Sequence, residues 1–241
     1  MKCAAFSGTR NIYDDMEMAA KSLIANSDVD KVYLLIEDDE FTHKLPDIVE
    51  TINVSSQTFF SPDGANANTQ YSYLSMMRVA LALMPEFNAY DKMLFCDCDI
   101  VAVDDVSDIW DIDVTDCYFA ACKEVWAKSR PGLLYCNTGV ALHNLDMMRT
   151  GKAKELIECL NRQYLRWIDQ DALSYLCQGK IALMPPEYNW CKWVIGYSKS
   201  QPKIVHYAGR NDWRDEPDAK TYRAMSWKTA MTNHAIMCGE L

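Results

Sequence analysis

Short hydrophobic runs and helical patterns alternate along the N-terminal part of the chain. The runs are bounded by polar or turn residues, as is typical of buried strands, and they lie at residues 2–6, 31–36 and 92–96, with a weaker one at 52–54. Between them, apolar residues at helical spacing predict amphipathic helices from about Asp14 and over residues 73–84, the second ended by Pro85. This alternation predicts right-handed crossovers and a mainly parallel sheet.

The rest of the chain continues the pattern. Strands are predicted at residues 117–122, 140–143, 181–184 and 203–209, and helices at 145–150, 152–165, 169–176 and, loosely, 217–241. No repeat, low-complexity segment or linker divides the sequence. We therefore expect one α/β domain over residues 1–241, with a mainly parallel, twisted sheet flanked by helices and a C-terminal helical segment.

Two carboxylates, Asp97 and Asp99, follow the central hydrophobic run. Ligands bind at the carboxyl ends of strands in parallel sheets, and the polar loop at residues 7–11 is expected at the same edge. Aspartates at i and i+2 can turn toward one hard cation such as Mg²⁺ or Mn²⁺, which are often held by carboxylates together with substrate phosphates. A metal site and a plain acidic turn both remain open from these residues alone.

Composition narrows the class of protein. The chain has 241 residues, of which 49% are apolar, so it can bury a substantial core. Its net charge of −10 disfavours a nucleic-acid backbone as the main partner, but a bound metal would let a small phosphate compound approach. We expect no transmembrane segment, because no run of about 18 apolar residues occurs, and no secretory signal, because the N-terminal stretch turns polar too early.

Ten cysteines are scattered through apolar contexts without a CxxC pair. This distribution in a long chain favours reduced, mostly buried thiols in a cytoplasmic protein over a disulfide scaffold. Cys96 and Cys98 flank Asp97, but a structural zinc site would need two further ligands at recognisable spacing.

Three more polar clusters lie at predicted strand ends or helix starts: residues 137–139, residues 169–171 and His206. Each has an ordinary explanation, as a turn, a helix N-cap and a hydrogen-bonded structural histidine. Their order along the chain, after the Asp97 and Asp99 turn, is more specific than any one of them.

The chain resembles the retaining glycosyltransferases of family 8, which include glycogenin and bacterial lipopolysaccharide galactosyl- and glucosyltransferases. The resemblance covers about residues 2–213 and rests on an ordered series of segments at residues 90–101, 105–110, 136–145, 169–173 and 205–209. It implies a GT-A fold, which is a nucleotide-binding α/β domain with a metal at the Asp97 and Asp99 turn. It also implies transfer of a hexose, glucose or galactose, from a UDP-sugar.

The resemblance assigns residues to the donor and its metal. Asp97, Asp99 and His206 would ligate Mn²⁺ or Mg²⁺, which bridges the diphosphate. Thr9 and Asn11 would hold the uridine. Further residues matched to donor binding are Arg78, Cys98, Asn137, Thr138, Gly139, Asp169, Gly209 and Arg210, with Asn137 to Gly139 and Asp169 on the sugar hydroxyls and Arg78 near the sugar and diphosphate. A surface position on an amphipathic helix is the alternative for Arg78.

Gln170 matches the residue beneath the anomeric carbon. An amide is a poor nucleophile, so we favour front-side attack, with the Gln170 carbonyl oxygen stabilising positive charge. A covalent intermediate on Asp169 or Gln170 is the alternative.

The chain departs from the family after Gly209. Its segment there is one residue shorter than the family's and lacks the lysine that contacts the diphosphate. Arg210 or Arg214 is the candidate replacement. The first loop also differs, with only Asn11 plainly kept. Two alternative functions follow: a non-catalytic nucleotide-sugar-binding protein, and a haloacid-dehalogenase-type phosphohydrolase, whose nucleophile motif resembles the stretch around Asp97. The acceptor, whether a glycan, a lipid-linked sugar or a protein, is not readable from the sequence.

Overall fold

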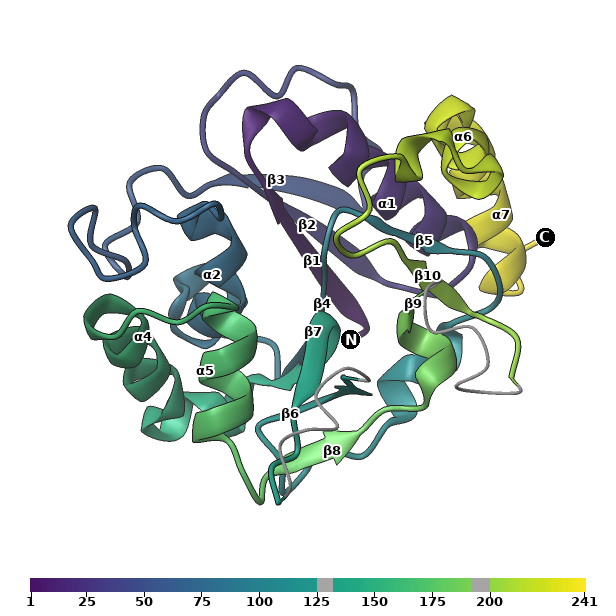
Figure 1. Ribbon diagram of the computed structural model, residues 1–241. Helices are drawn as coiled ribbons and strands as arrows, with labels where there is room; N and C mark the ends of the chain where they lie inside the picture. The colour runs from purple at the N-terminus through teal and green to yellow at the C-terminus, as the bar shows by residue number, and fades with distance from the viewer. Residues whose placement is uncertain (125–131, 192–199) are drawn as a thin grey trace.

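A central sheet separates two layers of helices in the computed structural model, which describes residues 1–124, 132–191 and 200–241 (Figure 1). Over these residues the sheet has seven strands in the order β3-β2-β1-β4-β7-β6-β8. Their bounds are β1 Cys3–Gly8, β2 Lys31–Ile36, β3 Val49–Asn53, β4 Lys92–Cys96, β6 Phe119–Lys123, β7 Cys136–Asn144 and β8 Ile181–Leu183.

The sheet is mainly parallel, as the sequence predicts. Strands β1 to β4 run in the same direction, β7 is antiparallel to both of its neighbours, and β8 is parallel to β6. Strand β1 lies beside β4, with Phe6 opposite Cys96. The loop after β1 and the turn after β4 therefore share one edge, which confirms the predicted arrangement.

Successive side chains of the central strands enter opposite hydrophobic layers. Phe6 and Leu94 belong to one buried cluster, and Ala5 and Phe95 to the other. Because both faces of these strands are covered, their sequences read as continuous apolar runs rather than as an alternating pattern.

Helices cover the two faces as separate groups (Figure 1). Helix α1 packs against α6 and α7 on one face, and α2, α4 and α5 pack together on the other. The helix bounds are α1 Tyr13–Ala25, α2 Tyr73–Ala80, α3 Leu145–Met147, α4 Ala153–Arg162, α5 Ile168–Leu176, α6 Pro217–Ala224 and α7 Trp227–Met237. No helix among the described residues has the length and hydrophobicity needed to cross a bilayer.

A second sheet of three strands, within the described residues, carries part of the site. It consists of β5 (Ile100–Ala102), β10 (Ile204–His206) and β9 (Trp190–Cys191), with β10 in the middle. Strand β10 is antiparallel to β5, and this pairing sets His206 opposite Ile100. This register places His206, which lies far along the chain, directly beside the turn that follows β4.

Two sequence expectations need correction. Residues 137–139 are not a turn, because they lie inside β7, where a register shift in β6 lets Asn137 pair with Cys122. The predicted strand at residues 203–209 is shorter, since β10 ends at His206 and Gly209 follows in a turn with a φ of 73°. All ten cysteines are unpaired.

Candidate active site

The chain leaves β4 at Cys96 and turns through Asp97 and Asp99 before β5 begins. The backbone N–H of Asp97 donates to the Gly139 carbonyl at 2.7 Å, which fixes the turn against β7. The two carboxylates stay partly accessible, with side-chain exposures of 34% for Asp97 and 28% for Asp99. They are therefore held by a buried strand while their oxygens remain available to a ligand.

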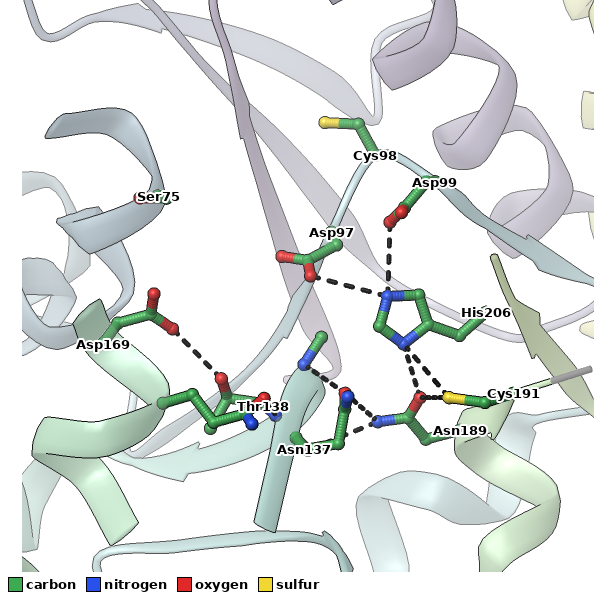
Figure 2. Close-up of polar contacts among 12 residues, drawn as sticks. Ser75, Asp97, Cys98, Asp99, Asn137, Thr138, Asp169, Asn189, Cys191 and His206 are labelled. Carbon is green, nitrogen blue, oxygen red and sulfur yellow. Dashed lines mark hydrogen bonds and ion pairs between the residues drawn. The ribbon is translucent and has the colours of Figure 1, made fainter. Parts of the chain in front are cut away.

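His206 completes a cluster with these carboxylates (Figure 2). Its Nε2 lies 3.3 Å from Asp99 Oδ1 and 3.6 Å from Asp97 Oδ2. One ligand atom from each residue lies within 4.8 Å of the others. We refer to Asp97, Asp99 and His206 as the acid–histidine trio. The structure brings together the three residues that the resemblance assigns to a metal.

The donor set of the trio fits a divalent cation. His206 is buried, and among the described residues its Nε2 makes no hydrogen bond, an arrangement that is unfavourable unless another group engages the nitrogen. Two carboxylates and one imidazole nitrogen are ligands that Mn²⁺ and Mg²⁺ accept together with substrate oxygens. The residues present therefore fit the metal that the family implies.

Gly139 provides the space for this cluster. A Cβ atom at this position would lie 2.1 Å from His206 Cε1 and 2.8 Å from Asp97 Oδ2. Any side chain at residue 139 would overlap the trio, so the glycine is required by close approach rather than by an unusual backbone angle.

Arg78 connects the trio to a second group of polar residues. It is only 4% exposed, so its interpretation as a surface arginine is wrong. Its guanidinium pairs with Asp97 and with Asp169, the latter at 3.0 Å, and also donates to the Thr138 carbonyl. A single buried cation thus lies between two carboxylates that come from different elements.

Asp169 and Gln170 lie in the first turn of helix α5, and the Asp169 carboxylate points toward Thr138 (Figure 2). The Thr138 hydroxyl donates to Asp169 Oδ2 at 3.0 Å, and the Thr138 N–H lies 3.4 Å from Gln170 Oε1. We call Asp169 and Gln170 the helix-start pair. The helix-start pair and the trio come from distant parts of the sequence. Arg78 contacts both, through Asp169 and Asp97.

Charge and burial shift the acidity of these groups. Burial opposes ionisation of Asp97, but Arg78 and His206 outweigh it and lower the pKa of Asp97. Burial raises the pKa of Asp169 in spite of Arg78. Burial disfavours the charged ring of His206, yet Asp99 outweighs it, so the pKa of His206 rises well above its ordinary value. Nε2 therefore sits where a proton or a cation is favoured.

The predicted uridine loop lies at the same edge. Thr9 is half-buried and donates to the exposed Asn11. Cys98 is buried and its thiol donates to the Ser7 carbonyl at 3.2 Å, so the side chain faces the core. The contacts of Thr9, Asn11 and Cys98 with a donor remain predictions.

The two arginines after β10 have different surroundings. Arg210 pairs with Asp212 and Glu216. Arg214 makes hydrogen bonds from Nε to both carboxylate oxygens of the buried Asp15, at 3.0 and 3.1 Å. Asp15 raises the pKa of Arg214, and Asp99 adds to that rise. Arg214 is therefore within electrostatic range of the trio.

The sequence interpretation did not identify Asn189. Asn189 contacts the far side of the His206 ring, with Oδ1 2.7 Å from Nδ1. It lies between Tyr188 and Trp190, and this local pattern gives no sign of a functional role.

The family model of glycosyl transferase family 8 matches residues 3–216. The chain belongs to this family. The match excludes the haloacid-dehalogenase alternative, and the position of the Asp97 turn after β4 rather than after the first strand agrees with that.

Curated relatives of this family 8 chain are distant. A putative glycosyltransferase from Haemophilus influenzae is 25% identical over 183 residues, covering 65% of this chain and 56% of the relative. Glycosyltransferase GlyE from Streptococcus pneumoniae is 21% identical over 263 residues, covering 99% of this chain and 63% of the relative. The chain thus spans little more than half the length of these relatives.

Solved structures show the same fold. The crystal structure of GlyE from S. pneumoniae TIGR4 has a TM-score of 0.70 at 19% identity, covering 99% of this chain and 64% of that one. The galactosyltransferase LgtC, solved with donor and acceptor sugar analogues, has a TM-score of 0.66 at 17% identity, covering 99% of this chain and all of that one. The expected GT-A fold is confirmed.

Proposed function

We propose that this chain is a metal-dependent retaining glycosyltransferase that moves a hexose, glucose or galactose, from a UDP-sugar to an acceptor. The supporting observation is the continuity of the site: the acid–histidine trio and the helix-start pair flank one buried arginine, Arg78. A diphosphate would lie on the trio side and the sugar on the pair side. LgtC, which shares the fold, was solved with donor and acceptor sugar analogues.

The trio would hold Mn²⁺ or Mg²⁺ together with the donor diphosphate. When bound, the cation would offset the negative charge that grows on the β-phosphate as the anomeric C–O bond breaks. Arg78 neutralises part of the negative charge of the trio, because its guanidinium pairs with Oδ1 of Asp97. The other oxygen of Asp97, Oδ2, and Asp99 Oδ1 lie beside His206 Nε2, where the cation would bind.

The helix-start pair would act at the sugar. Oδ2 of Asp169 forms an ion pair with Arg78 and accepts a hydrogen bond from the Thr138 hydroxyl, so this oxygen is already engaged and the carboxylate is poorly placed as a nucleophile. Gln170 is half-buried, and its Oε1 lies 3.4 Å from the Thr138 N–H. We therefore assign Asp169 to orienting the sugar hydroxyls, and the Gln170 carbonyl oxygen to stabilising positive charge at the anomeric carbon during front-side attack.

Replacing Gln170 tests this assignment. We expect Gln170→Ala to lower turnover, measured as UDP release from UDP-glucose or UDP-galactose with Mn²⁺, by about 10²-fold or more, as for other electrostatic stabilisers. UDP affinity, measured by calorimetry, should change less than about threefold because the amide faces the sugar. Equal losses of turnover and affinity would remove Gln170 from the chemical step.

A nucleotide-sugar-binding protein without catalysis is the second candidate, favoured by the missing lysine after Gly209. Release of UDP by the wild-type protein distinguishes the two, because a binder alone leaves the donor intact.

We further propose that residues 1–241 act as one domain in a reducing compartment, the cytoplasm. Ten unpaired cysteines, most of them buried, support this location. The acceptor is a glycan, a lipid-linked sugar or a protein.

A further inference from the structure

Two buried amides, those of Asn189 and Asn137, continue from the Nδ1 side of the His206 ring as a series of hydrogen bonds (Figure 2). Asn189 is the last residue of the short helix η7 (Pro186–Asn189), and Asn137 is near the start of β7. Asn189 Oδ1 lies 2.7 Å from His206 Nδ1, and Asn189 Nδ2 donates to Asn137 Oδ1 at 2.9 Å. The three side chains are 8% exposed or less.

The orientation of the Asn137 amide is fixed from two sides. Its Oδ1 accepts from the backbone N–H of Gly139 at 3.0 Å, and its Nδ2 donates to Glu124 Oε2 at 2.9 Å. A backbone N–H can only donate and an ionised carboxylate can only accept. Rotating the amide by 180° would therefore break both hydrogen bonds and place like groups in contact.

The orientation of Asn189 follows from that of Asn137. Its Nδ2 faces two acceptors, the Asn137 side-chain oxygen at 2.9 Å and the Asn137 backbone carbonyl at 3.3 Å. The oxygen of Asn189 must then face His206 Nδ1. Two acceptors would repel at 2.7 Å, so Nδ1 carries a proton. The thiol of Cys191, at 4.0 Å from Nδ1, is too distant to compete with this bond.

We propose that Asn189 and Asn137 are positioning residues that keep the proton of neutral His206 on Nδ1 and so leave Nε2 unprotonated toward Asp97 and Asp99. The inference rests on the proposed function, since it concerns how the trio receives its metal. Second ligand-sphere hydrogen bonds of this kind set which imidazole nitrogen is available to a metal.

The proposal gives Asn137 a role besides the sugar contact implied by the family. Its oxygen accepts two hydrogen bonds within the protein, and its nitrogen already donates to Glu124. A substitution at Asn137 is therefore expected to change metal affinity even when no donor sugar is present.

The first test locates the ring proton in the wild-type protein. ¹⁵N-histidine NMR recorded over a pH series, with and without Mg²⁺, distinguishes the two nitrogens of His206. We expect Nε2 to be the nitrogen that loses its proton and that responds to Mg²⁺, while Nδ1 stays protonated. A neutral ring with the proton on Nε2 would overturn the proposal, and this test requires no variant to fold.

The second test compares Asn189→Leu with Asn144→Leu. Asn144 is a buried asparagine at the other end of β7 whose amide bonds only backbone groups. Mn²⁺ binding is followed by electron paramagnetic resonance with UDP present. We expect Asn189→Leu to weaken Mn²⁺ binding 10- to 100-fold, and Asn144→Leu to leave it within twofold. Asn189→Asp, which restores an acceptor for Nδ1–H, should bind Mn²⁺ at least threefold more tightly than Asn189→Leu.

Equal Mn²⁺ affinities in wild type and folded Asn189→Leu would contradict the proposal, as would equal losses in the two leucine variants. Failure of the wild type to bind Mn²⁺ would count against the proposed function, whereas the NMR of the metal-free ring would still decide the position of the proton.

Discussion

Gly139 shows how a residue without a side chain shapes the site. A Cβ atom there would meet His206 and Asp97 at distances no real structure tolerates. Glycine at position 139 is therefore explained by the close approach of His206 and Asp97, not by backbone flexibility.

We expect Gly139→Ala to weaken Mn²⁺ binding by at least tenfold, because His206 and Asp97 must move apart to admit the methyl group. The measurement is Mn²⁺ titration with UDP present. Gly179→Ala is the matched control: its positive φ of 79° costs stability, but no atom of the described residues lies within 4 Å of the added atom. Unaltered Mn²⁺ affinity in Gly139→Ala would contradict the steric account.

His143 is a buried histidine outside the site. Neither ring nitrogen has a hydrogen-bond partner in the part of the chain that the structure describes, and the ring stacks on Phe119 with centroids 6.0 Å apart. Burial lowers its pKa from 6.5 to about 3, and the positive charge of Arg78 adds to this effect. The folded protein thus holds a neutral imidazole that the unfolded chain would protonate.

This depressed pKa makes stability dependent on pH in a defined direction. The stability is fully present above pH 6.5 and is lost as the pH falls from there toward 3. Between pH 7 and pH 5 the loss is about 2 kcal/mol. We expect urea unfolding of wild type to show this loss in excess of that in His143→Leu, since all other titrating groups are shared. Parallel pH profiles would show that His143 does not contribute.

At the scale of elements, ion pairs connect the C-terminal segment to helix α1. Asp15 of α1 is buried and pairs with Arg214 and with Arg223 of α6. Of the two candidate arginines, Arg210 and Arg214, it is Arg214 whose pKa is raised in part by Asp99. This makes Arg214 the better candidate for the missing lysine.

We expect Arg214→Gln to weaken binding of UDP with Mn²⁺ by about 10- to 150-fold, the range for loss of one charged hydrogen bond. Calorimetry with UDP is the measurement. Arg223→Gln is the control, because it removes a second partner of the same Asp15 from a helix further along the chain. Similar losses in both variants would assign Arg214 to anchoring α6 rather than to the diphosphate.

The elements were predictable where hydrophobic pattern and local turns agree. The apolar run before Asp97 and the helical spacing of apolar residues from Asp14 are both local patterns, and both correspond to buried elements, β4 and α1. Strand β5 was not predictable as a separate element, because its partner β10 lies far along the chain. Arg78 was ambiguous, since α2 is covered on several sides and helical spacing alone assigns arginine to the surface.

Site residues were predictable in proportion to their local signal. Asp97 and Asp99 stand out after a buried run. Asn189 does not, because its role depends on Asn137 and His206, which lie 52 and 17 positions away. Such contacts arise only from the folded arrangement of β7, η7 and β10.

At the scale of the whole molecule, a chain with a net charge of −10 carries two partly exposed aspartates, Asp97 and Asp99, where we propose that a negatively charged donor binds. Arg78 offsets part of this charge from within the core, and a cation held by the trio would offset more. We therefore expect donor use to depend on a divalent metal.

The most direct measurement is UDP release from a panel of nucleotide sugars with Mn²⁺ and with a chelator. The account expects release from UDP-glucose or UDP-galactose that needs Mn²⁺ and falls at least 10²-fold in Asp99→Asn. Absence of metal-dependent release from every UDP-sugar would contradict it.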